Sequence, residues 1–402
     1  LDGKIVYTCA CGDTYEEAIK AEGHKYTTVV TDPTCEDKGY TTYTCDKCGD
    51  SYVADYVDAL GHTAGAWIVD TEATVTAAGA QHKECTVCGE TVKEMIIPRK
   101  IKFAGASLTL ESNIAINYKV KPEYFNTDKY DEIYLIVEWA GQTYKLENPV
   151  YNEKENLWQF AFKEVSGNMM TDVAVATLYG VYEGEVFEGN SAEYSVVAYA
   201  KSMIVKDTTA AKVKKLIVDL VNYGTAAQNY TKHNLEELAN EWLSEEQKAL
   251  GTQEDREVTT HQDLKYKVID NPTVTWKGAG LKLESAITIR YTIEANDLTD
   301  LKAVVVLNGQ TFEVPASEFK PVKNYANRYD VYFTGAAASH MSMPVLATIV
   351  KGDTEVSDTV QYSIESYVKA QYGKDGVDAK LITLLKEMIK YGDSAYDYAY
   401  GK

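Results

Sequence analysis

LTLESNIAINY (residues 108–118) decides the fold of most of this chain, because nearly the same phrase returns as LKLESAITIRY at 281–291. Apolar residues alternate with polar ones along the first copy, at Leu108, Leu110, Ile114, Ile116 and Tyr118. A period of two is the pattern of β-strands with one buried face. The stretch therefore predicts strands, and its return predicts a second domain of the same fold.

Four further phrases recur behind it in the same order. They are IVEWAGQTYKL (136–146) and VVVLNGQTFEV (304–314), VATLYG (175–180) and LATIVK (346–351), EYSVVAYAKSM (193–203) and QYSIESYVKAQ (361–371), and LVNYGTAAQNY (220–230) and MIKYGDSAYDY (388–398). Five phrases in one order indicate a tandem duplication, with copies at 101–233 and 272–402.

Each copy begins with β sequence and ends with helical sequence. AGQT (140–143) and NGQT (308–311) lie between β-branched runs and predict hairpin turns. Short strands at this spacing predict an antiparallel, Ig-like sandwich. Apolar residues then follow one helix face in each copy, at Val213, Leu216, Ile217, Leu220, Val221 and Ala227, and at Leu381, Leu384, Leu385, Met388, Ile389 and Ala395. We expect each helix to dock on its own sandwich.

Two further features of the duplicated region carry expectations. Gly224 and Gly392 lie in mid-helix, where glycine is costly, so we expect a close approach between helix and sheet. Between the copies, NLEELANEWLSEEQKALG (234–251) predicts one amphipathic helix, because Asn234 and Glu237 suit a capping box. A polar segment follows, and 234–271 is predicted to be a helical linker.

The N-terminal quarter is built differently, because all seven cysteines lie before residue 90. YTCACGDTY (7–15) and YTCDKCGDSY (43–52) are one phrase with a residue missing in the first, and KECTVCGETV (83–92) is a looser third copy. AEGHKY, beginning at 21, matches ALGHTA, beginning at 59, so the period is 38 residues. This predicts a truncated Cys repeat and two complete ones, at 1–22, 23–61 and 62–100.

Units this small need a metal or a disulfide to hold them together. Read forward from each Gly-His, the sequence predicts two sets of soft ligands: His24, Cys35, Cys45 and Cys48, and then His62, His82, Cys85 and Cys88. Thr74 stands near the place that Cys35 holds in the first set. Four sulfur and nitrogen ligands that include a Cys-x-x-Cys turn can close a tetrahedral zinc site.

Disulfides are the alternative to structural zinc, because an extracellular setting favours them and Cys35 could bridge to Cys45 or Cys48. The last unit has only Cys85 and Cys88, which would have to close a tight ring with each other. A redox pair is disfavoured, since thioredoxin-like chemistry needs its Cys-x-x-Cys at a helix N-terminus. Zinc accounts for the histidines as well as the cysteines.

Charge and composition exclude several classes of function. The 402 residues carry a formal net charge of −20, which opposes binding to nucleic acid and to anionic membranes. No apolar run reaches the roughly 18 residues that a membrane-spanning helix needs. Leu1 falls within a repeat and no signal peptide follows it, so we expect a monomeric excerpt of a longer protein.

No common catalytic motif occurs, and the prediction is that the protein is not an enzyme. Sugar-binding sandwiches use exposed aromatic rings. Trp139 and Trp158 are the candidates in the first copy, and Leu307 and Tyr329 align with them in the second. The predicted ligand-binding residues are Trp139, Trp158 and Tyr329, with burial in the core as the alternative.

The stretch GHKYTTVVTDPTCEDKGYTTYTCDKCGDSYVADYVDALGH (23–62) resembles a repeat of large secreted and wall-attached proteins from anaerobic Gram-positive gut bacteria. The duplicated pattern behind it resembles a module of the same proteins. The resemblance covers nearly the whole chain and implies a non-catalytic part at the cell surface. The resemblance supplies no ligand, but starch or host-glycan binding is a known role of surface proteins in such organisms, so we expect an adhesin or binding segment that recognises carbohydrate. The alternatives are a host protein such as an immunoglobulin, or a purely structural stalk.

Overall fold

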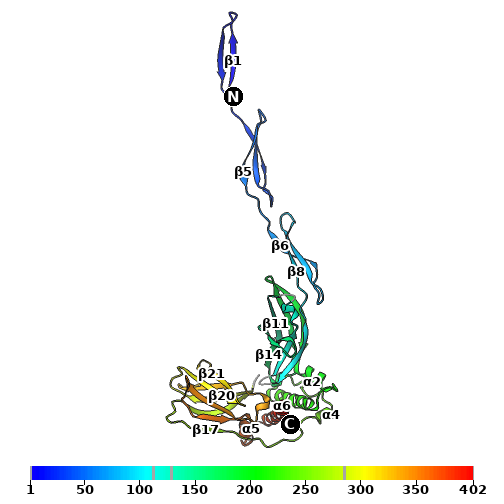
Figure 1. Ribbon diagram of the computed structural model, residues 1–402, viewed down its shortest axis with the longest axis vertical. Helices are drawn as coiled ribbons and strands as arrows, with labels where there is room; N and C mark the ends of the chain where they lie inside the picture. The colour runs from blue at the N-terminus through cyan, green and yellow to red at the C-terminus, as the bar shows by residue number, and fades with distance from the viewer. Residues whose placement is uncertain (1, 111–113, 127–129, 284–286, 402) are drawn as a thin grey trace. The chain divides into compact units, whose positions relative to one another are not determined.

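The computed structural model describes residues 2–110, 114–126, 130–283 and 287–401, and it is mainly β with a smaller share of helix. The chain divides into two compact units, Leu1–Arg99 and Lys100–Lys402 (Figure 1). The fold class predicted from the sequence, β-rich repeats followed by β-rich domains with some helices, is confirmed.

The first unit consists of three small antiparallel sheets. The first is the hairpin β1–β2, and in the other two the strands follow sequence order, β3–β4–β5 and β6–β7–β8. Their bounds are Gly3–Thr8, Thr14–Ile19, Tyr26–Thr31, Gly39–Cys45, Ser51–Val57, Ala64–Thr71, Gly79–Cys85 and Thr91–Ile97. Few apolar side chains are buried among the described residues of this unit: Cys35, Cys45, Ala73, Cys85, Met95, Ile97 and Pro98. Three of these seven are cysteines, so the sheets have almost no hydrophobic core of their own.

The first copy of the duplication is a sandwich of two four-stranded antiparallel sheets. One sheet has the order β13–β14–β10–β9 and the other β12–β11–β15–β16. The bounds are β9 Phe103–Leu110, β10 Ile114–Val120, β11 Glu132–Trp139, β12 Gln142–Leu146, β13 Val150–Asn152, β14 Leu157–Val165, β15 Ala174–Tyr182 and β16 Glu185–Tyr194, with the short helix α1 at Glu123–Asn126. Ile114, Ile116 and Tyr118 are buried, as the alternation predicts.

The second copy repeats this plan with one addition. Its sheets have the orders β18–β19–β23–β22 and β17–β26–β24–β20–β21, and β25 pairs with β24. The bounds are β17 Asp263–Lys267, β18 Thr275–Leu283, β19 Ile287–Glu294, β20 Leu301–Leu307, β21 Gln310–Pro315, β22 Lys320–Pro321, β23 Arg328–Phe333, β24 Val345–Lys351, β25 Thr354–Glu355 and β26 Thr359–Tyr362. Strand β17 comes from the predicted linker, so part of that segment belongs to this sheet.

The two hairpin turns form where the sequence places them. Ala140 and Gly141 have φ values of 50° and 75°, and Asn308 and Gly309 have 49° and 76°. Two consecutive positive φ values define the tight turn that matches strand twist. Residues 111–113 and 284–286, within the phrase that opened the sequence argument, lie outside the described residues.

Each copy ends in two helices, α2 (Val196–Ile204) and α3 (Ala211–Thr231) in the first, and α5 (Ile364–Tyr372) and α6 (Ala379–Tyr400) in the second. Ser195 and Ser363 cap α2 and α5, because their hydroxyl oxygens accept hydrogen bonds from the N–H groups of Ala198 and Ser366. Across the described residues, none of the helices combines the length and apolar character that a membrane span requires.

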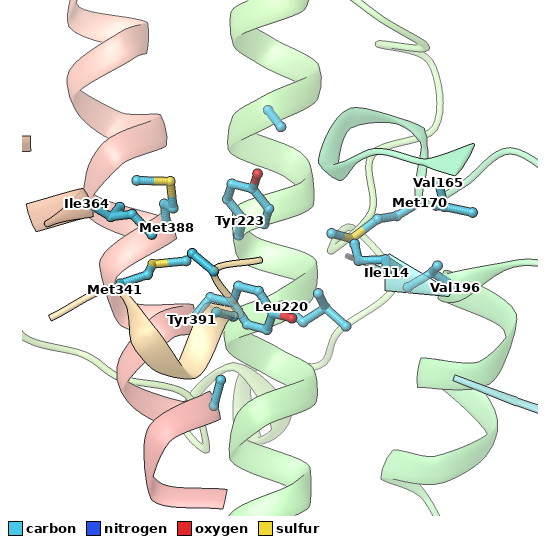
Figure 2. Close-up of a cluster of buried hydrophobic side chains, with 14 of the residues drawn as sticks. Ile114, Val165, Met170, Val196, Leu220, Tyr223, Met341, Ile364, Met388 and Tyr391 are labelled. Carbon is cyan, nitrogen blue, oxygen red and sulfur yellow. The ribbon is translucent and has the colours of Figure 1, made fainter. Parts of the chain in front are cut away.

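The long helices α3 and α6 pack against each other, a contact that the apolar stripes of the two helices do not predict. Figure 2 shows the two helices side by side, with Tyr223, Tyr391, Met388 and Met341 among the side chains around their contact. The rings of Tyr223 and Tyr391, which occupy the same position in the two repeats, stack at 5.7 Å between centroids. The duplicated domains therefore share one buried core.

The mid-helix glycines allow close packing, but the neighbour is a turn and its methionine, whereas we expected a sheet. A Cβ atom at Gly224 would lie 2.7 Å from Met170 Sδ, and one at Gly392 would lie 2.6 Å from Met341 Sδ. Met170 and Met341 each directly follow a short 3₁₀ turn, η1 (Gly167–Met169) and η3 (Ala338–His340). A third such turn, η2 (Ala316–Glu318), lies elsewhere in the second copy.

The predicted helix at 234–251 is wrong. Only α4 (Glu245–Lys248) is helical there, and its capping box uses Ser244 and Gln247. The preceding residues are held instead by α3: the amide oxygen of Gln228 accepts from Ala239 N at 2.8 Å, and Thr225 Oγ1 accepts from Asn240 N at 3.0 Å. These buried hydrogen bonds capture N–H groups that a helix would use, so tertiary contacts override local propensity.

The polar segment after α4 is fixed to the helices of both copies. The buried carboxylate of Asp219 on α3 accepts from Thr252 N and Oγ1 at 2.7 and 2.8 Å. Arg256 bridges Glu365, whose side chain is fully buried, and Asp393 on α6, at 2.5 and 2.6 Å. The segment is therefore a docked part of the second unit.

Candidate metal centre

Four ligand side chains meet in the first unit, from two successive repeats. Cys35 comes from the turn between β3 and β4, and His62, Cys85 and Cys88 come from the next repeat. Their ligand atoms all lie within 4.8 Å of one another, and Cys35 and Cys85 are buried. A cluster of three sulfur atoms and one nitrogen could hold a metal ion.

The distances in this cluster suit tetrahedral coordination. Around a tetrahedral zinc ion with bonds of about 2.3 Å to sulfur and about 2.0 Å to nitrogen, two sulfurs lie about 3.8 Å apart and a sulfur and a nitrogen about 3.5 Å apart. Cys35 Sγ lies 3.7 Å from Cys85 Sγ, and His62 Nδ1 lies 3.4 Å from Cys88 Sγ. The sulfur atoms of Cys35, Cys85 and Cys88 are available as ligands, since none of these cysteines forms a disulfide.

The Cys-x-x-Cys turn holds its sulfurs by backbone hydrogen bonds. Gly89, with φ of 78°, donates its N–H to Cys85 O at 2.9 Å, and Cys85 N donates to Glu90 O at 2.7 Å. Glycine suits the residue after the second cysteine because a positive φ strains other side chains. The same turn recurs at Gly49, with φ of 74° and a 2.9 Å bond to Cys45 O.

The imidazole of His62 is oriented for metal binding. Its Nδ1 atom faces Cys88 Sγ, while Nε2 faces the carboxylates of Glu36 and Glu90 at 3.8 and 3.9 Å. Metal-bound histidines commonly direct the second ring nitrogen to a carboxylate, which fixes the ring and its tautomer. Glu36 neighbours Cys35, and Glu90 closes the Cys85 turn, so both carboxylates belong to the segments that supply ligands.

The thiols of the cluster differ in acidity. N–H groups of Cys88 and Val87, together with the His62 ring, lower the pKa of Cys85. Burial, followed by the neighbouring thiols of Cys85 and Cys88, raises the pKa of Cys35. The thiolate is the form that binds metal, so the turn stabilises the ligand form of Cys85.

The sequence predicted that Cys35 would join His24, Cys45 and Cys48 in one set of ligands. This grouping is wrong. In the β3–β4 register Thr31 lies opposite Tyr40, and Tyr26 lies opposite Cys45. Cys35 therefore lies beyond one end of β4, and the Cys45 turn lies at the other, about 20 Å away along a seven-residue strand. A strand of this length cannot bring both ends to one ion.

His82 is also outside the cluster. It lies on β7 three residues before Cys85, and side chains three apart on a strand point to opposite faces. Its Nδ1 pairs with Asp70 at 2.8 Å and its Nε2 with Glu84 at 3.3 Å, and both carboxylates raise the pKa of its ring. The predicted ligand is therefore a half-buried residue whose two ring nitrogens both face carboxylates.

The turn that contains Cys35 recurs in the next repeat, and the comparison shows which residue corresponds to Thr74. Thr34 and Thr74 make the same turn, because their N–H groups donate to Asp37 O and Ala77 O at 3.0 and 2.8 Å. Thr74 thus corresponds to Thr34, and Val75 occupies the place of Cys35. The last repeat accordingly offers no soft ligand in this turn.

A second cluster brings together His24, Cys45 and Cys48, the three other residues of the first predicted set. His24 Nδ1 lies 3.3 Å from Cys48 Sγ, and the N–H of Lys47 and the His24 ring lower the pKa of Cys45. It corresponds residue for residue to His62, Cys85 and Cys88. No fourth ligand joins it among the described residues.

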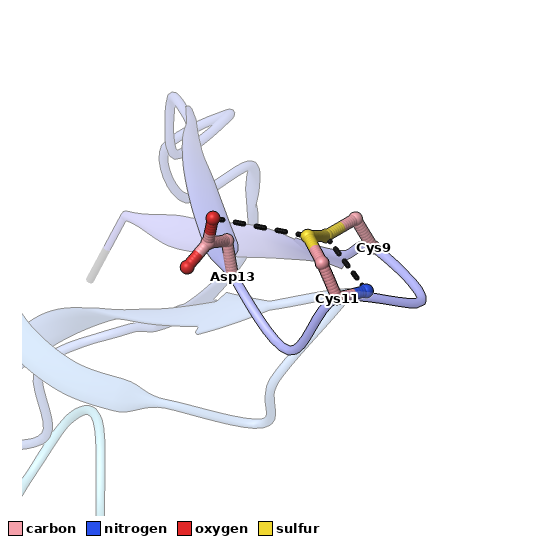
Figure 3. The surroundings of a disulfide bond; sticks show 3 residues. All are labelled: Cys9, Cys11 and Asp13. Carbon is pink, nitrogen blue, oxygen red and sulfur yellow. Dashed lines mark hydrogen bonds between the residues drawn. A yellow bond between two sulfur atoms is a disulfide. The ribbon is translucent and has the colours of Figure 1, made fainter.

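Cys9 and Cys11 form a disulfide across the β1–β2 turn, as Figure 3 shows. Asp13 Oδ2 lies 3.8 Å from Cys11 Sγ, and the three residues are exposed. One residue is missing here relative to the other two turns, so the Cys-x-Cys spacing places the sulfurs differently. Disulfide chemistry thus occurs in the first hairpin, while the five cysteines of the later repeats are free.

The predicted sugar-binding aromatics do not form one platform. Trp139 is only 5% exposed, because it lies on an inward position of β11 and packs edge-on against Phe162 at 5.4 Å. Trp158, on the other sheet, is half-buried between Phe125 and Tyr151 at 4.9 and 5.2 Å. Burial removes Trp139 as a platform and leaves Trp158 with Tyr151.

The aligned positions of the second copy face its core. Tyr329, which aligns with Trp158, is half-buried on β23 and packs against the core of the second copy. Leu307, which aligns with Trp139, is 1% exposed. The aromatic positions of the two copies are thus mainly packing positions.

No protein-family model matches the chain, and a search of curated proteins also gives no match.

Proposed function

We propose that the chain is a non-catalytic modular segment in which zinc joins successive small β repeats. The observation that carries this proposal is the cluster of Cys35 with His62, Cys85 and Cys88, because its ligands come from two repeats and its distances suit zinc. A metal ion there would fix the repeat at 23–61 to the repeat at 62–100. The repeats would then act as a structural spacer for the duplicated sandwich unit.

The scarcity of other buried residues supports a structural role for the metal. Sheets of three short strands bury too little apolar surface to be stable alone. Structural zinc sites supply folding free energy outright and keep no open coordination position. Four protein ligands fill a tetrahedral ion, so this site is not built to bind a substrate.

Elemental analysis of the purified full chain tests the zinc proposal. We expect tightly bound zinc in the wild type and loss of one zinc ion from His62→Ala. His82→Ala is the matched control and should retain its zinc, because His82 pairs with Asp70 and Glu84 instead. Absence of zinc, with Cys35 and Cys85 recovered as a disulfide, would overturn the assignment.

We also propose that the segment belongs to a cell-surface protein and that the sandwich unit recognises a starch-like or host glycan. The sequence resemblance suggests this role, and the half-buried Trp158 beside Tyr151, which is 40% exposed, supports it. Aromatic rings at the edge of a sandwich can pack against the C–H faces of sugars. The neighbouring Val150 is 73% exposed, so this edge is open to a ligand.

A glycan array and affinity gels test recognition of carbohydrate. We expect Trp158→Ala to weaken binding to any glycan retained by the wild type, while Tyr266→Ala, at an exposed tyrosine of β17, leaves it unchanged. If the chain binds no glycan but captures a serum or mucosal protein, the result would favour a host-protein partner. Silence in both assays would favour a purely structural stalk.

A further inference from the structure

A cavity of about 620 Å³ lies between α3, α6 and the segment that connects the two copies, and many of its lining residues are polar. Its floor is formed by the adjacent faces of the two long helices, through Asn222, Thr225 and Asn229 of α3 and Lys380 and Thr383 of α6. Asn240, Lys248, Thr252 and Gln253 of the connecting segment form another part of the wall, and Glu387 and Lys390 of α6 also line the cavity. Cavities of this size commonly hold small-molecule ligands.

The side-chain amides in this cavity leave both donors and acceptors unused. Asn222 Oδ1 accepts from Asn240 Nδ2 at 2.8 Å, which leaves Asn222 Nδ2 and Asn240 Oδ1 without a partner among the described residues. Asn229 Nδ2 donates to Thr225 O at 3.0 Å, so its Oδ1 is left as an acceptor. Gln253 donates to two backbone carbonyls and keeps its Oε1.

Most of the charge around the cavity is already neutralised. Lys390 pairs with Glu387 and Asp255 at 3.1 and 3.2 Å, and Lys248 pairs with Glu245 at 2.7 Å. Lys380 donates to the backbone oxygen of Asn229 at 3.2 Å and has donors to spare. An anion would meet three amide oxygens, whereas hydroxyl groups can both donate to these oxygens and accept from Asn222 and Lys380.

The duplication provides an internal comparison for the cavity. Because α3 and α6 are repeats of each other, Asn229 and Thr383 correspond to Asp397 and Lys215. Lys215 and Asp397 form an ion pair at 3.9 Å on the other side of the helix contact. Where the other side has this charged pair, the cavity has the amide of Asn229 and the hydroxyl of Thr383, which add hydrogen-bonding groups to a lining that also contains Lys380.

We propose that this cavity binds a short neutral oligosaccharide through the hydroxyl-binding amides of Asn222, Asn229, Asn240 and Gln253. This assignment rests on the proposed glycan recognition for its natural ligand, and it adds a site separate from the Trp158 edge. The ligand would contact helices of both copies, so one saccharide would bridge the duplicated domains.

NMR titration of the full chain with maltotriose and with lactose tests the proposal, with inorganic phosphate as the anionic comparison. We expect at least one saccharide to shift the side-chain amide signals of Asn222 and Asn229. The variant Asn229→Asp/Thr383→Lys copies the ion pair of the other side into the cavity, and should weaken binding about tenfold or more by removing hydrogen bonds and space. Lys215→Thr/Asp397→Asn is the matched control and should leave the affinity unchanged.

The outcomes separate this site from the broader proposal. Binding that survives Asn229→Asp/Thr383→Lys but is lost in Trp158→Ala would overturn the cavity site and leave glycan recognition standing. Phosphate shifts without saccharide shifts would overturn the neutral-ligand assignment. No shift of the cavity amides by either saccharide, in a chain that binds other glycans on the array, would likewise reject the cavity alone.

Discussion

In the first unit, Cys35, Cys45 and Cys85 are three of the seven buried apolar side chains among the described residues, whereas one continuous apolar cluster runs through both sandwiches and the helices of the second unit. Burial of apolar area stabilises a domain in proportion to the area removed from water. The second unit has that area, and the first does not. The comparison teaches that the two units cannot be stabilised in the same way: the duplication has a shared core, whereas the repeats have clusters of Cys and His that could hold a metal ion.

Removal of metal should have the largest effect and should separate the two units. We expect a strong zinc chelator to abolish protection from hydrogen exchange in β6–β8, since structural zinc contributes on the order of 10 kcal/mol to such small domains. Protection in α3 and α6 should not change. Hydrogen exchange measured by mass spectrometry on the full chain reports both regions at once. An equal loss of protection in both units, or no loss in either unit, would contradict the proposed difference between them.

Within the second unit, the ion pair between the partly exposed Arg256 and the fully buried carboxylate of Glu365 should be the most sensitive polar contact. Arg256→Ala leaves a fully buried carboxylate without its cation, at an expected cost of about 3–5 kcal/mol in the free energy of unfolding. Arg328→Ala is the control, because Arg328 and Glu294 are partly exposed and should contribute under about 1 kcal/mol. Urea denaturation measures both. Equal effects would show that the docked segment is not fixed by this contact.

The helix contact should respond to a single methyl group. Gly392→Ala improves helix propensity by up to about 1 kcal/mol, but its Cβ would lie 2.6 Å from Met341 Sδ and 3.2 Å from Ala338 O. Overpacking typically costs about 1–3 kcal/mol, so we expect a net loss of about 1–2 kcal/mol. Gly373→Ala, with its nearest neighbour at 3.8 Å, should be nearly neutral. A rise in Tm for Gly392→Ala would contradict the packing.

A pH effect at Asp255 should be the smallest. Lys386, and to a lesser extent Lys390, hold the pKa of this carboxylate below its usual value. A lowered pKa in the folded state gives stability that is present above the unfolded pKa near 4 and is lost as the pH falls further. Because Asp255 is partly exposed, the effect should be about 0.2–1 kcal/mol. Thermal unfolding of the wild type and Asp255→Asn between pH 3 and 7 should show the difference narrowing at low pH; a constant difference would argue against this pairing.

Much of the fold could be predicted from the sequence because repetition made the pattern visible twice. The alternation at Ile114, Ile116 and Tyr118 placed a strand, and the Asn308-Gly309 turn placed a hairpin. The contact between α3 and α6 could not be found in this way, since the apolar stripe of a helix does not say whether a sheet or another helix covers it. The segment at 234–244 was wrongly predicted to be helical, because its N–H groups at 239 and 240 form hydrogen bonds with Gln228 and Thr225 and not within a helix.

The four residues of the candidate metal cluster were all predicted to be ligands, but the sequence assigned them to two different sets. Proximity in sequence joined Cys35 to Cys45, but a strand of seven residues separates them. The signal that could have found the correct set was the length of β4 together with the position of the turns at its two ends. His82 was misassigned for a related reason, because strand parity directs it away from Cys85. The burial of Trp139 could not be predicted, because a tryptophan can lie on either face of a strand and the packing of the two sheets decides which face of β11 is buried.

The most direct test of the central claim, that one metal ion joins two successive repeats, is the zinc content of Cys35→Ser, Cys85→Ser and the double variant. If Cys35 and Cys85 bind the same ion, each single variant and the double variant lose the same one zinc ion per chain. If Cys35 belonged with Cys45 and Cys48, the double variant would lose two zinc ions where each single variant loses one, and that result would contradict the account.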